Sequence, residues 1–133
     1  MSTIKYGFTG TRNGMSTEQK NNVIKLLQKD IDDKKKIEAH HGDCIGADKD
    51  FHNICTNLKI TVIIHPPDND KLRAFCKSDN VRNQLPYLDR NKNIVNETNI
   101  LIACPVSKDE ELRSGTWMTI RYAKKINRPV LIF

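Results

Sequence analysis

The chain has few aromatic residues and no long apolar run. Only 6% of its 133 residues are aromatic, and no apolar stretch approaches the roughly 20 residues that a membrane-spanning helix needs. We therefore expect no membrane partner. The first ten residues, MSTIKYGFTG, lack the basic segment and apolar run of a secretory signal peptide, which favours a cytoplasmic (intracellular) protein.

Several common site signatures are also missing. The four cysteines, at positions 44, 55, 76 and 104, form no CxxC pair, which argues against a zinc knuckle and provides no disulfide framework. Neither the GxxxxGK[ST] motif of a P-loop nor the GxGxxG motif of a dinucleotide-binding turn is present. We predict neither an ATPase nor a dehydrogenase, and we expect no metal and no cofactor.

Positive charge is in excess. The chain has 22 Lys and Arg against 16 Asp and Glu, which favours anionic partners, although much of the excess lies in solvated runs such as DDKKK and YAKKINR. Single-stranded DNA is one such partner. Because its binding needs a basic groove interleaved with exposed aromatic residues, the scarcity of aromatics makes nucleic acid the weakest hypothesis.

Short apolar stretches alternate with helical patterns along the chain. Strands are predicted over residues 4–8, 36–41, 60–65, 99–105 and 129–133, and helices after a Ser16 cap and over about 47–58, 88–97 and 115–126. This alternation predicts one α/β domain over residues 1–133, a Rossmann-like three-layer α/β/α fold. Its five-stranded, mainly parallel sheet should have the order 3-2-1-4-5.

The loops at the carboxyl ends of these strands are where a ligand should lie. After the first strand, Thr9, Gly10, Thr11 and Arg12 combine close backbone approach, hydroxyl and amide donors, and a guanidinium, as in a phosphate cradle. The alternative is a tight turn with a surface arginine.

A second glycine-containing turn precedes the last predicted helix. Arg113, Ser114, Gly115 and Thr116 lie where the positive end of a helix dipole favours an anion. Ordinary capping by Ser114 or Thr116 is the alternative. Together, the loops 9–12 and 113–116 suggest one phosphate-bearing ligand held between two helix N-termini.

The stretch HHGDCIGAD, residues 40–48, is rich in potential metal ligands. Strand alternation, however, points His40 and His41 to opposite faces, which disfavours zinc. We interpret the stretch as a backbone loop in which Gly42 and Gly46 allow close approach to the ligand. Asp48 then either caps the following helix or acts in catalysis. The predicted ligand contacts in this loop are Gly42, Asp43, Gly46 and Asp48.

Three motifs resemble those of one superfamily. GFTGTR is similar to the first phosphate-side loop of the SLOG superfamily, and GDCIGADKDFH to the G-x-A-x-G-[IV]-D-x-x-A-H stretch of DNA-uptake processing proteins. The run from residue 89 to 120 resembles the R-K-x-x-M…P-G-G-x-G-T-x-x-E region of the LOG phosphoribohydrolases. As a whole, the chain resembles the small stand-alone SLOG proteins related to YpsA. This resemblance implies that it binds a nucleotide ligand and forms homo-oligomers.

This resemblance also implies roles for single residues. Arg90 matches the LOG catalytic arginine, and Gly115 and Thr116 match its phosphate loop. Asn91 stands in place of the lysine, Leu112 and Arg113 in place of the two glycines, and Thr119 in place of the catalytic glutamate. Because N-glycosidic hydrolysis needs a carboxylate, the LOG mechanism does not transfer intact.

Four loop acids could replace that carboxylate: Asp43, Asp48, Glu110 and Glu111. Glu111, just before the phosphate turn, is the favoured candidate, and a solvated charged KDEE loop is the alternative. The leading hypothesis is a nucleotide-binding domain, with Arg90 near the sugar and Trp117 either stacking on a base or packing in the core. The second is an enzyme that cleaves the N-glycosidic bond of a nucleoside 5′-monophosphate.

One long connection, residues 65–87, has weak periodicity. Long loops are often functional, and this one could close over a ligand or form a subunit contact.

Overall fold

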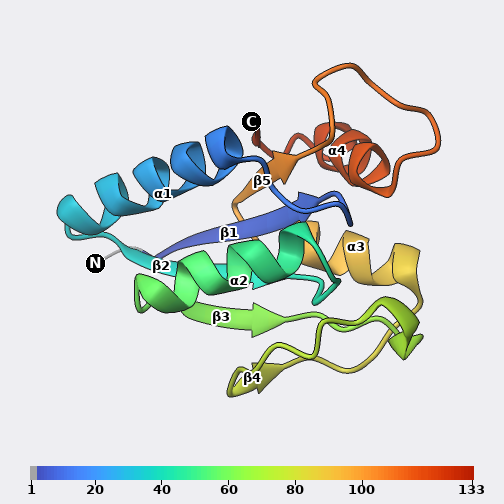
Figure 1. The fold of residues 1–133 in the computed structure, drawn as a ribbon, viewed down its shortest axis with the longest axis horizontal. Helices are drawn as coiled ribbons and strands as arrows, with labels where there is room; N and C mark the ends of the chain where they lie inside the picture. Colours follow the sequence, from blue (N-terminus) through green and yellow to red (C-terminus); the bar gives the residue numbers. More distant parts are fainter. Residues whose placement is uncertain (1–2) are drawn as a thin grey trace.

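A computed structural model describes residues 3–133. Six parallel strands form one sheet in the order β4-β3-β2-β1-β5-β6 (Figure 1). The strands are β1 (Thr3–Gly10), β2 (Lys36–His41), β3 (Thr61–Ile64), β4 (Asn80–Val81), β5 (Ile100–Cys104) and β6 (Val130–Ile132). The helices are α1 (Thr17–Asp32), α2 (Ala47–Asn57), α3 (Tyr87–Asn96), α4 (Gly115–Lys125) and a short 3₁₀ helix, η1 (Asp70–Leu72).

The predicted Rossmann-like architecture is confirmed, with one strand more than expected. The predicted order 3-2-1-4-5 is the observed β3-β2-β1-β5-β6. Strand β4 was not predicted: it lies within the long connection and pairs with Ile63 and Ile64 at the edge of the sheet. Two exposed residues are too few to show the alternation that identifies a strand.

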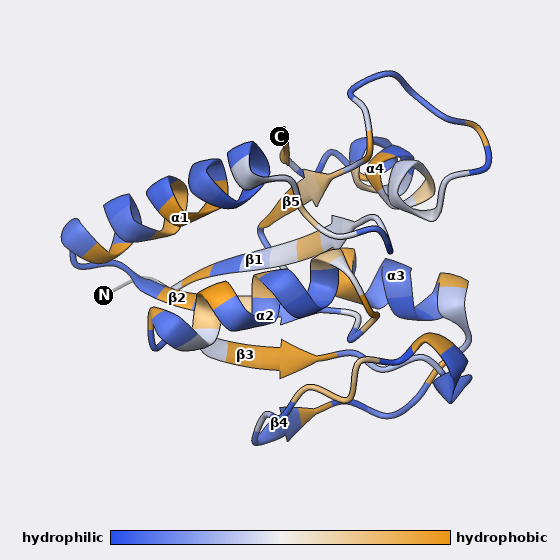
Figure 2. Cartoon of the chain, in the orientation of Figure 1, coloured by the Kyte–Doolittle hydropathy of each residue, from blue (hydrophilic) through white to orange (hydrophobic). Residues whose placement is uncertain are grey.

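Helices α1 and α2 cover one face of the sheet, and α3 and α4 cover the other (Figure 1). Hydropathy follows the layers: β3 is almost uniformly apolar, and the helices are polar over most of their outer surface (Figure 2). One hydrophobic core lies between the sheet and the helices α1 and α2, and in it Phe8 of β1 and Phe51 of α2 stack with ring centroids 4.3 Å apart. A second core lies between the sheet and α4. Trp117 is 5% exposed and packs there, so of its two predicted roles packing in the core is the correct one.

Helix α1 begins as the sequence predicts. The Ser16 hydroxyl accepts from the amide of Gln19 at 3.0 Å, and the Gln19 side chain accepts from the amide of Ser16 at 2.9 Å. This reciprocal capping box satisfies two of the amides that the first turn of a helix leaves free. It fixes where the loop after β1 ends.

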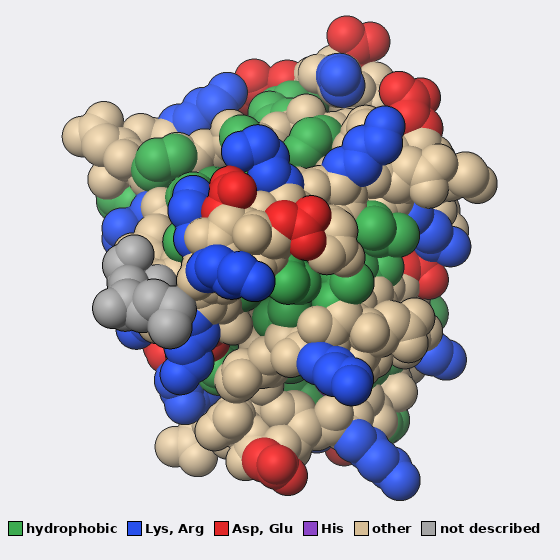
Figure 3. All heavy atoms as spheres, turned by 90° about the vertical axis from the view of Figure 1, so that its left-hand side faces the viewer, with side chains coloured by type: hydrophobic (Ala, Val, Ile, Leu, Met, Phe, Trp, Pro, Cys, Tyr) green, Lys and Arg blue, Asp and Glu red, His purple; other side chains and the backbone are tan. Residues whose placement is uncertain are grey.

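None of the helices in the described part of the chain is long and apolar enough to cross a bilayer. At the amino ends of the strands, Lys and Arg side chains are scattered among acidic and polar ones (Figure 3). The positive charge on this face is therefore not gathered into one patch.

Candidate functional site

A cavity of about 600 Å³ opens at the carboxyl edge of the sheet. Its walls come from the loops after β1 and β2, the segment after β3, the first turns of α3, and the loop and first turn of α4. These segments lie on the right of Figure 1. The volume falls within the range of roughly 300–1,000 Å³ typical of small-molecule sites.

Most of the residues predicted to contact or act on a ligand come together here. The cavity is lined by Thr9, Gly10, Thr11, Arg12, Gly42, Asp48, Arg90, Glu111, Arg113, Ser114, Gly115 and Thr116. They come from the junctions that follow β1, β2 and β5 and from α3, at the edge where neighbouring parallel strands end. Their roles toward a ligand stay predictions.

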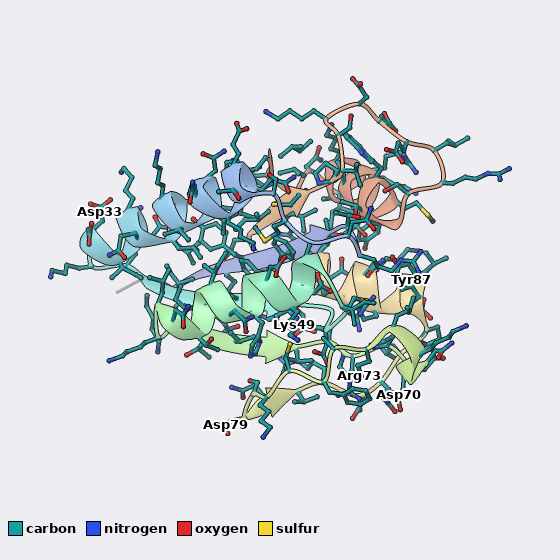
Figure 4. All side chains as sticks on the ribbon, in the orientation of Figure 1. Asp33, Lys49, Asp70, Arg73, Asp79 and Tyr87 are labelled. Atoms are coloured by element: carbon teal, nitrogen blue, oxygen red, sulfur yellow. The ribbon has the colours of Figure 1, made fainter. Side chains whose placement is uncertain are left out.

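Asp43, a predicted ligand contact, does not line the cavity. Its fully buried carboxylate accepts from Nε of Arg73 at 2.8 Å and from the amide of Cys76 at 2.9 Å. Arg73 in turn lies 3.7 Å from the carboxylate of Asp70 (Figure 4). Asp43 therefore ties the loop after β2 to the segment after β3 instead of facing a ligand.

Gly46 also lies outside the cavity lining and positions another residue. Its φ is +89°, and a Cβ there would overlap the backbone carbonyl of Arg12. The amide of Ala47 donates to the carbonyl of Thr11 at 2.9 Å. The close backbone approach that was expected toward a ligand is thus made to the loop after β1, which Gly46 helps to hold in place.

Arg90 is the most deeply buried cation of the cavity, at 3% exposure. Its guanidinium donates to the carbonyls of Gly42 and His65 and to the Asn91 side chain, and it lies 5.0 Å from the ring centre of Tyr87. All of these partners are neutral. Within residues 3–133, no carboxylate lies within 4 Å of this guanidinium.

Asp48 is the buried carboxylate of the cavity. It is the second residue of α2 and accepts from the amide of Cys44 at 3.1 Å, while Gly46 is the N-cap, so of the two alternatives for Asp48 the capping one is wrong. Burial raises the pKa of Asp48 to about 6, although the nearby Arg90 guanidinium acts in the opposite direction. Burial, and then the charge of Asp48, also raise the pKa of the Cys44 thiol.

The two glutamates of the KDEE loop are exposed. Glu110 pairs with Arg121 at 2.8 Å, as expected of a solvated charged loop. Glu111 lines the cavity, and its carbonyl accepts from the amide of Ser114 at 3.4 Å. Burial beside a guanidinium favours Asp48 over Glu111 as a group that could exchange a proton with a ligand.

The first turn of α4 is capped as the alternative interpretation predicts, and it also has amides without a partner. The Ser114 hydroxyl accepts from the amide of Trp117 at 3.2 Å, which is ordinary capping. Within the described residues, the amides of Gly115 and Thr116 have no hydrogen-bond partner, so they remain free for an anion.

Sequence reasoning allowed the connection after β3 to close over a ligand but named none of its residues as ligand contacts. Lys71, Tyr87 and Leu88 line the cavity, and Tyr87 lies at the start of α3 on this edge of the sheet (Figure 4). The tyrosine hydroxyl sits so close to Gly115 that no Cβ fits there. The only signal in the sequence was the length of the connection.

A scan against models of known protein families finds no match, and a search among curated proteins finds none either. Solved structures do match. The molybdenum cofactor binding protein of the bacterium Rippkaea orientalis is 18% identical with a TM-score of 0.73, over 99% of this chain and 77% of that one. The Moco carrier protein of Chlamydomonas reinhardtii is 18% identical with a TM-score of 0.70, over 99% and 76%.

DNA processing protein A of Streptococcus pneumoniae is 20% identical with a TM-score of 0.70, over 97% of this chain and 50% of that one. The fold is of the SLOG type. The present chain spans about half the length of DNA processing protein A, and the likeness to all three is one of fold.

In this SLOG-type fold, the residues that match the LOG pattern line the cavity, and two of the residues that depart from it form hydrogen bonds within the protein. Arg90, Gly115 and Thr116, which match, all line the cavity. Thr119, at the position of the LOG glutamate, is buried and donates to the carbonyl of Gly115 at 3.0 Å. Asn91, at the position of the LOG lysine, accepts from Nε of Arg90 at 2.8 Å.

Proposed function

We propose that this SLOG-type chain binds a nucleotide or nucleotide-derived ligand at the carboxyl ends of the strands. The loops 9–12 and 113–116 would hold its phosphates. The observation that carries the proposal is the buried Arg90 guanidinium, which faces the cavity with neutral partners alone.

A buried charge is costly unless an opposite charge compensates it. Three carbonyl and amide oxygens and the Cys44 sulfur accept from Arg90, and none of them gives its charge a contacting counter-ion. Asp48 is the buried acid of the cavity, but within the described residues it forms no ion pair with Arg90, so the two charges act on each other only at longer range. An anionic ligand would supply the missing partner.

The phosphate end of the ligand has candidate partners at the two loops. Arg12 and Arg113 are exposed, line the cavity, and form no ion pair with the described residues. The free amides of Gly115 and Thr116 point along the dipole of α4, which favours an anion at this end of the helix.

The remaining wall suits the apolar part of a ligand. Tyr87 and Leu88 of α3 and Met118 of α4 line the cavity and are each more than a third exposed. Two proteins of similar fold bind the molybdenum cofactor by name. That cofactor therefore belongs beside the nucleotides among the ligands to test.

The test is thermal stability and calorimetry with a panel of ligands. The panel contains nucleoside mono-, di- and triphosphates, nicotinamide dinucleotides, cyclic nucleotides and the molybdenum cofactor. For any ligand that binds, Arg90→Met should weaken affinity by about thirtyfold or more, because it removes one partner of a buried charge pair. Lys25→Gln, an exposed change on α1 away from the cavity, is the control. Absence of binding by every member refutes the proposal.

Asp48 favours a second candidate function, cleavage of the N-glycosidic bond of a nucleoside 5′-monophosphate. A buried carboxyl group with a pKa of about 6 can give or take a proton near neutral pH. Asp48 would take the role that the sequence analysis gave to Glu111.

Chromatography of each bound ligand separates the two functions. A ligand recovered intact supports a binding protein. Release of free base supports the enzyme, and then Asp48→Asn should abolish release while Glu111→Gln leaves it largely unchanged. If no monophosphate yields free base at high protein concentration, the enzymatic candidate is refuted.

A further inference from the structure

Away from the side chains of the ligand cavity, two buried histidines meet on the α3 side of the sheet. His40 of β2 and His65, which directly follows β3, are 1% and 2% exposed. Nδ1 of His40 lies 2.8 Å from Nε2 of His65. Neighbouring parallel strands bring the two rings together, although 25 residues separate them in sequence.

Each ring has a carboxylate at its far nitrogen. Oε1 of Glu38 lies 2.8 Å from Nε2 of His40, and Oε2 of Glu97 lies 3.7 Å from Nδ1 of His65. A carboxylate favours a hydrogen on the nitrogen it faces. If both far nitrogens carry hydrogen, the two near nitrogens face each other as lone pairs.

The other neutral arrangement has a weaker conflict. If Nε2 of His65 carries the hydrogen and donates to His40, then the lone pair on Nδ1 of His65 faces the Glu97 carboxylate at 3.7 Å, a repulsion between two acceptors. A cation between the two rings removes both conflicts. A shared proton is disfavoured as that cation because a buried imidazolium loses its hydration.

We propose that His40, His65 and Glu97 form a binding site for a divalent transition metal ion of the zinc type. One ligand atom from each residue lies within 4.8 Å of the others. Zinc–nitrogen bonds of about 2.0–2.1 Å in tetrahedral geometry need nitrogens roughly 3.3 Å apart. The rings would have to separate by about half an ångström, and Oε2 of Glu97 would have to turn from Nδ1 of His65 toward the ion.

The surroundings of these residues suit such a site. Arg82 donates to Oε1 of Glu97 at 2.9 and 3.1 Å, which orients the carboxylate and leaves Oε2 toward His65. Glu38 on His40 reproduces the carboxylate–histidine–metal arrangement that holds ligating imidazoles in place. The side chain of Glu97 is 35% exposed, which provides a route for the ion and for a water as fourth ligand.

Imidazole and carboxylate donors together suit zinc, cobalt or nickel better than magnesium or calcium, which prefer oxygen ligands alone.

A second histidine cluster, on the α2 side, has a different hydrogen-bond pattern. His41, His52 and Cys76 also offer ligand atoms within 4.8 Å of one another. Nδ1 of His41, however, accepts from the amide of Asp43 at 2.9 Å, so its Nε2 carries the hydrogen and donates to Nδ1 of His52 at 2.8 Å. This cluster is satisfied without an ion and provides the matched controls.

The prediction that His40 and His41 point to opposite faces is correct. That argument against zinc considered only residues of the stretch 40–48. The partners of His40, at positions 65 and 97, come from other elements.

The experiment uses the full chain without a polyhistidine tag, treated with a chelator and then exposed to Zn²⁺ or Co²⁺. We expect one ion per chain by elemental analysis, d–d absorption bands with Co²⁺, and a melting temperature higher by about 5–10 °C at hundredfold excess over Kd. His65→Gln should abolish retention. Glu38→Gln should weaken it by about 10- to 100-fold, because it removes the carboxylate that orients His40.

Two controls belong to the other cluster. His52→Gln and Cys76→Ser should retain the ion with unchanged affinity. If His65→Gln does not fold, the partly exposed Glu38→Gln and Glu97→Gln decide, with circular dichroism to verify their fold. The proposal is overturned if the parent chain retains no ion, or if the ion survives Glu97→Gln and is lost on Cys76→Ser.

Discussion

Replacing Asp48 by asparagine should stabilise the protein at neutral pH. The carboxyl group is 7% exposed and has a pKa of about 6 in the folded chain, against an ordinary value of 3.8. Asparagine has nearly the same shape as the protonated acid and can still accept from the Cys44 amide. The variant therefore keeps the hydrogen bond and avoids the buried charge.

The sign and size of the effect follow from linkage. Because the folded state binds this proton more tightly than the unfolded chain, the contribution of Asp48 to stability is largest below pH 3.8. It falls as the pH rises to about 6 and is constant above. At about 1.4 kcal/mol per pH unit, the full loss is about 3 kcal/mol. Asp48→Asn should recover up to that amount at pH 7.

Urea unfolding of both chains from pH 4 to 8 measures this difference. Buried histidines such as His65, whose pKa burial lowers to about 4, give slopes of the opposite sign that cancel in the comparison. Asp109→Asn, an exposed change in the loop before α4, should differ from the parent by less than about 0.5 kcal/mol at every pH. A gap between Asp48→Asn and the parent that does not grow with pH would refute the reasoning.

Three further changes test the packing around the site. Gly46→Ala forces a side chain into a positive φ and against the carbonyl of Arg12, so urea unfolding should show a loss of at least about 2 kcal/mol; an unchanged midpoint would contradict this. Phe51→Ala removes the ring stacked on Phe8 and should cost about 3–5 kcal/mol in the same assay, and a loss under 1 kcal/mol would mean that the core closes over the gap. Tyr6→Phe deletes the 2.5 Å hydrogen bond to the buried Asp30 and should lower the unfolding free energy by about 1–3 kcal/mol at pH 7, whereas a stabilised variant would argue that Asp30 finds another donor.

The fold was predictable because local patterns and general rules of connection agree. Ser16 and Gln19 identify the start of α1, and the right-handed crossover rule arranges the central five strands. Strand β4 was not predictable, since its two residues pair only because β3 leaves a free edge.

The site was predictable to the level of loops. Strand ends meet at one edge, which brings residues as far apart as Thr9 and Thr116 to the same cavity. The burial of individual side chains, and their partners from distant parts of the chain, were not predictable. Asp43 faces Arg73 from 30 positions away, and the choice of Asp48 over Glu111 depends on solvent exclusion that no local pattern records.

Gly42 has a consequence for how the sequence can vary. A Cβ at this position would lie within the space of the Arg90 guanidinium, which donates to the Gly42 carbonyl. Substitution at either position therefore changes what the other tolerates: a side chain at 42 expels the arginine, and loss of the arginine opens room at 42. In relatives of this chain we expect glycine and arginine, 48 positions apart, to be gained and lost as a pair. Covariation between these two positions would then distinguish, among related sequences, the cavities that keep this buried cation from those that have lost it.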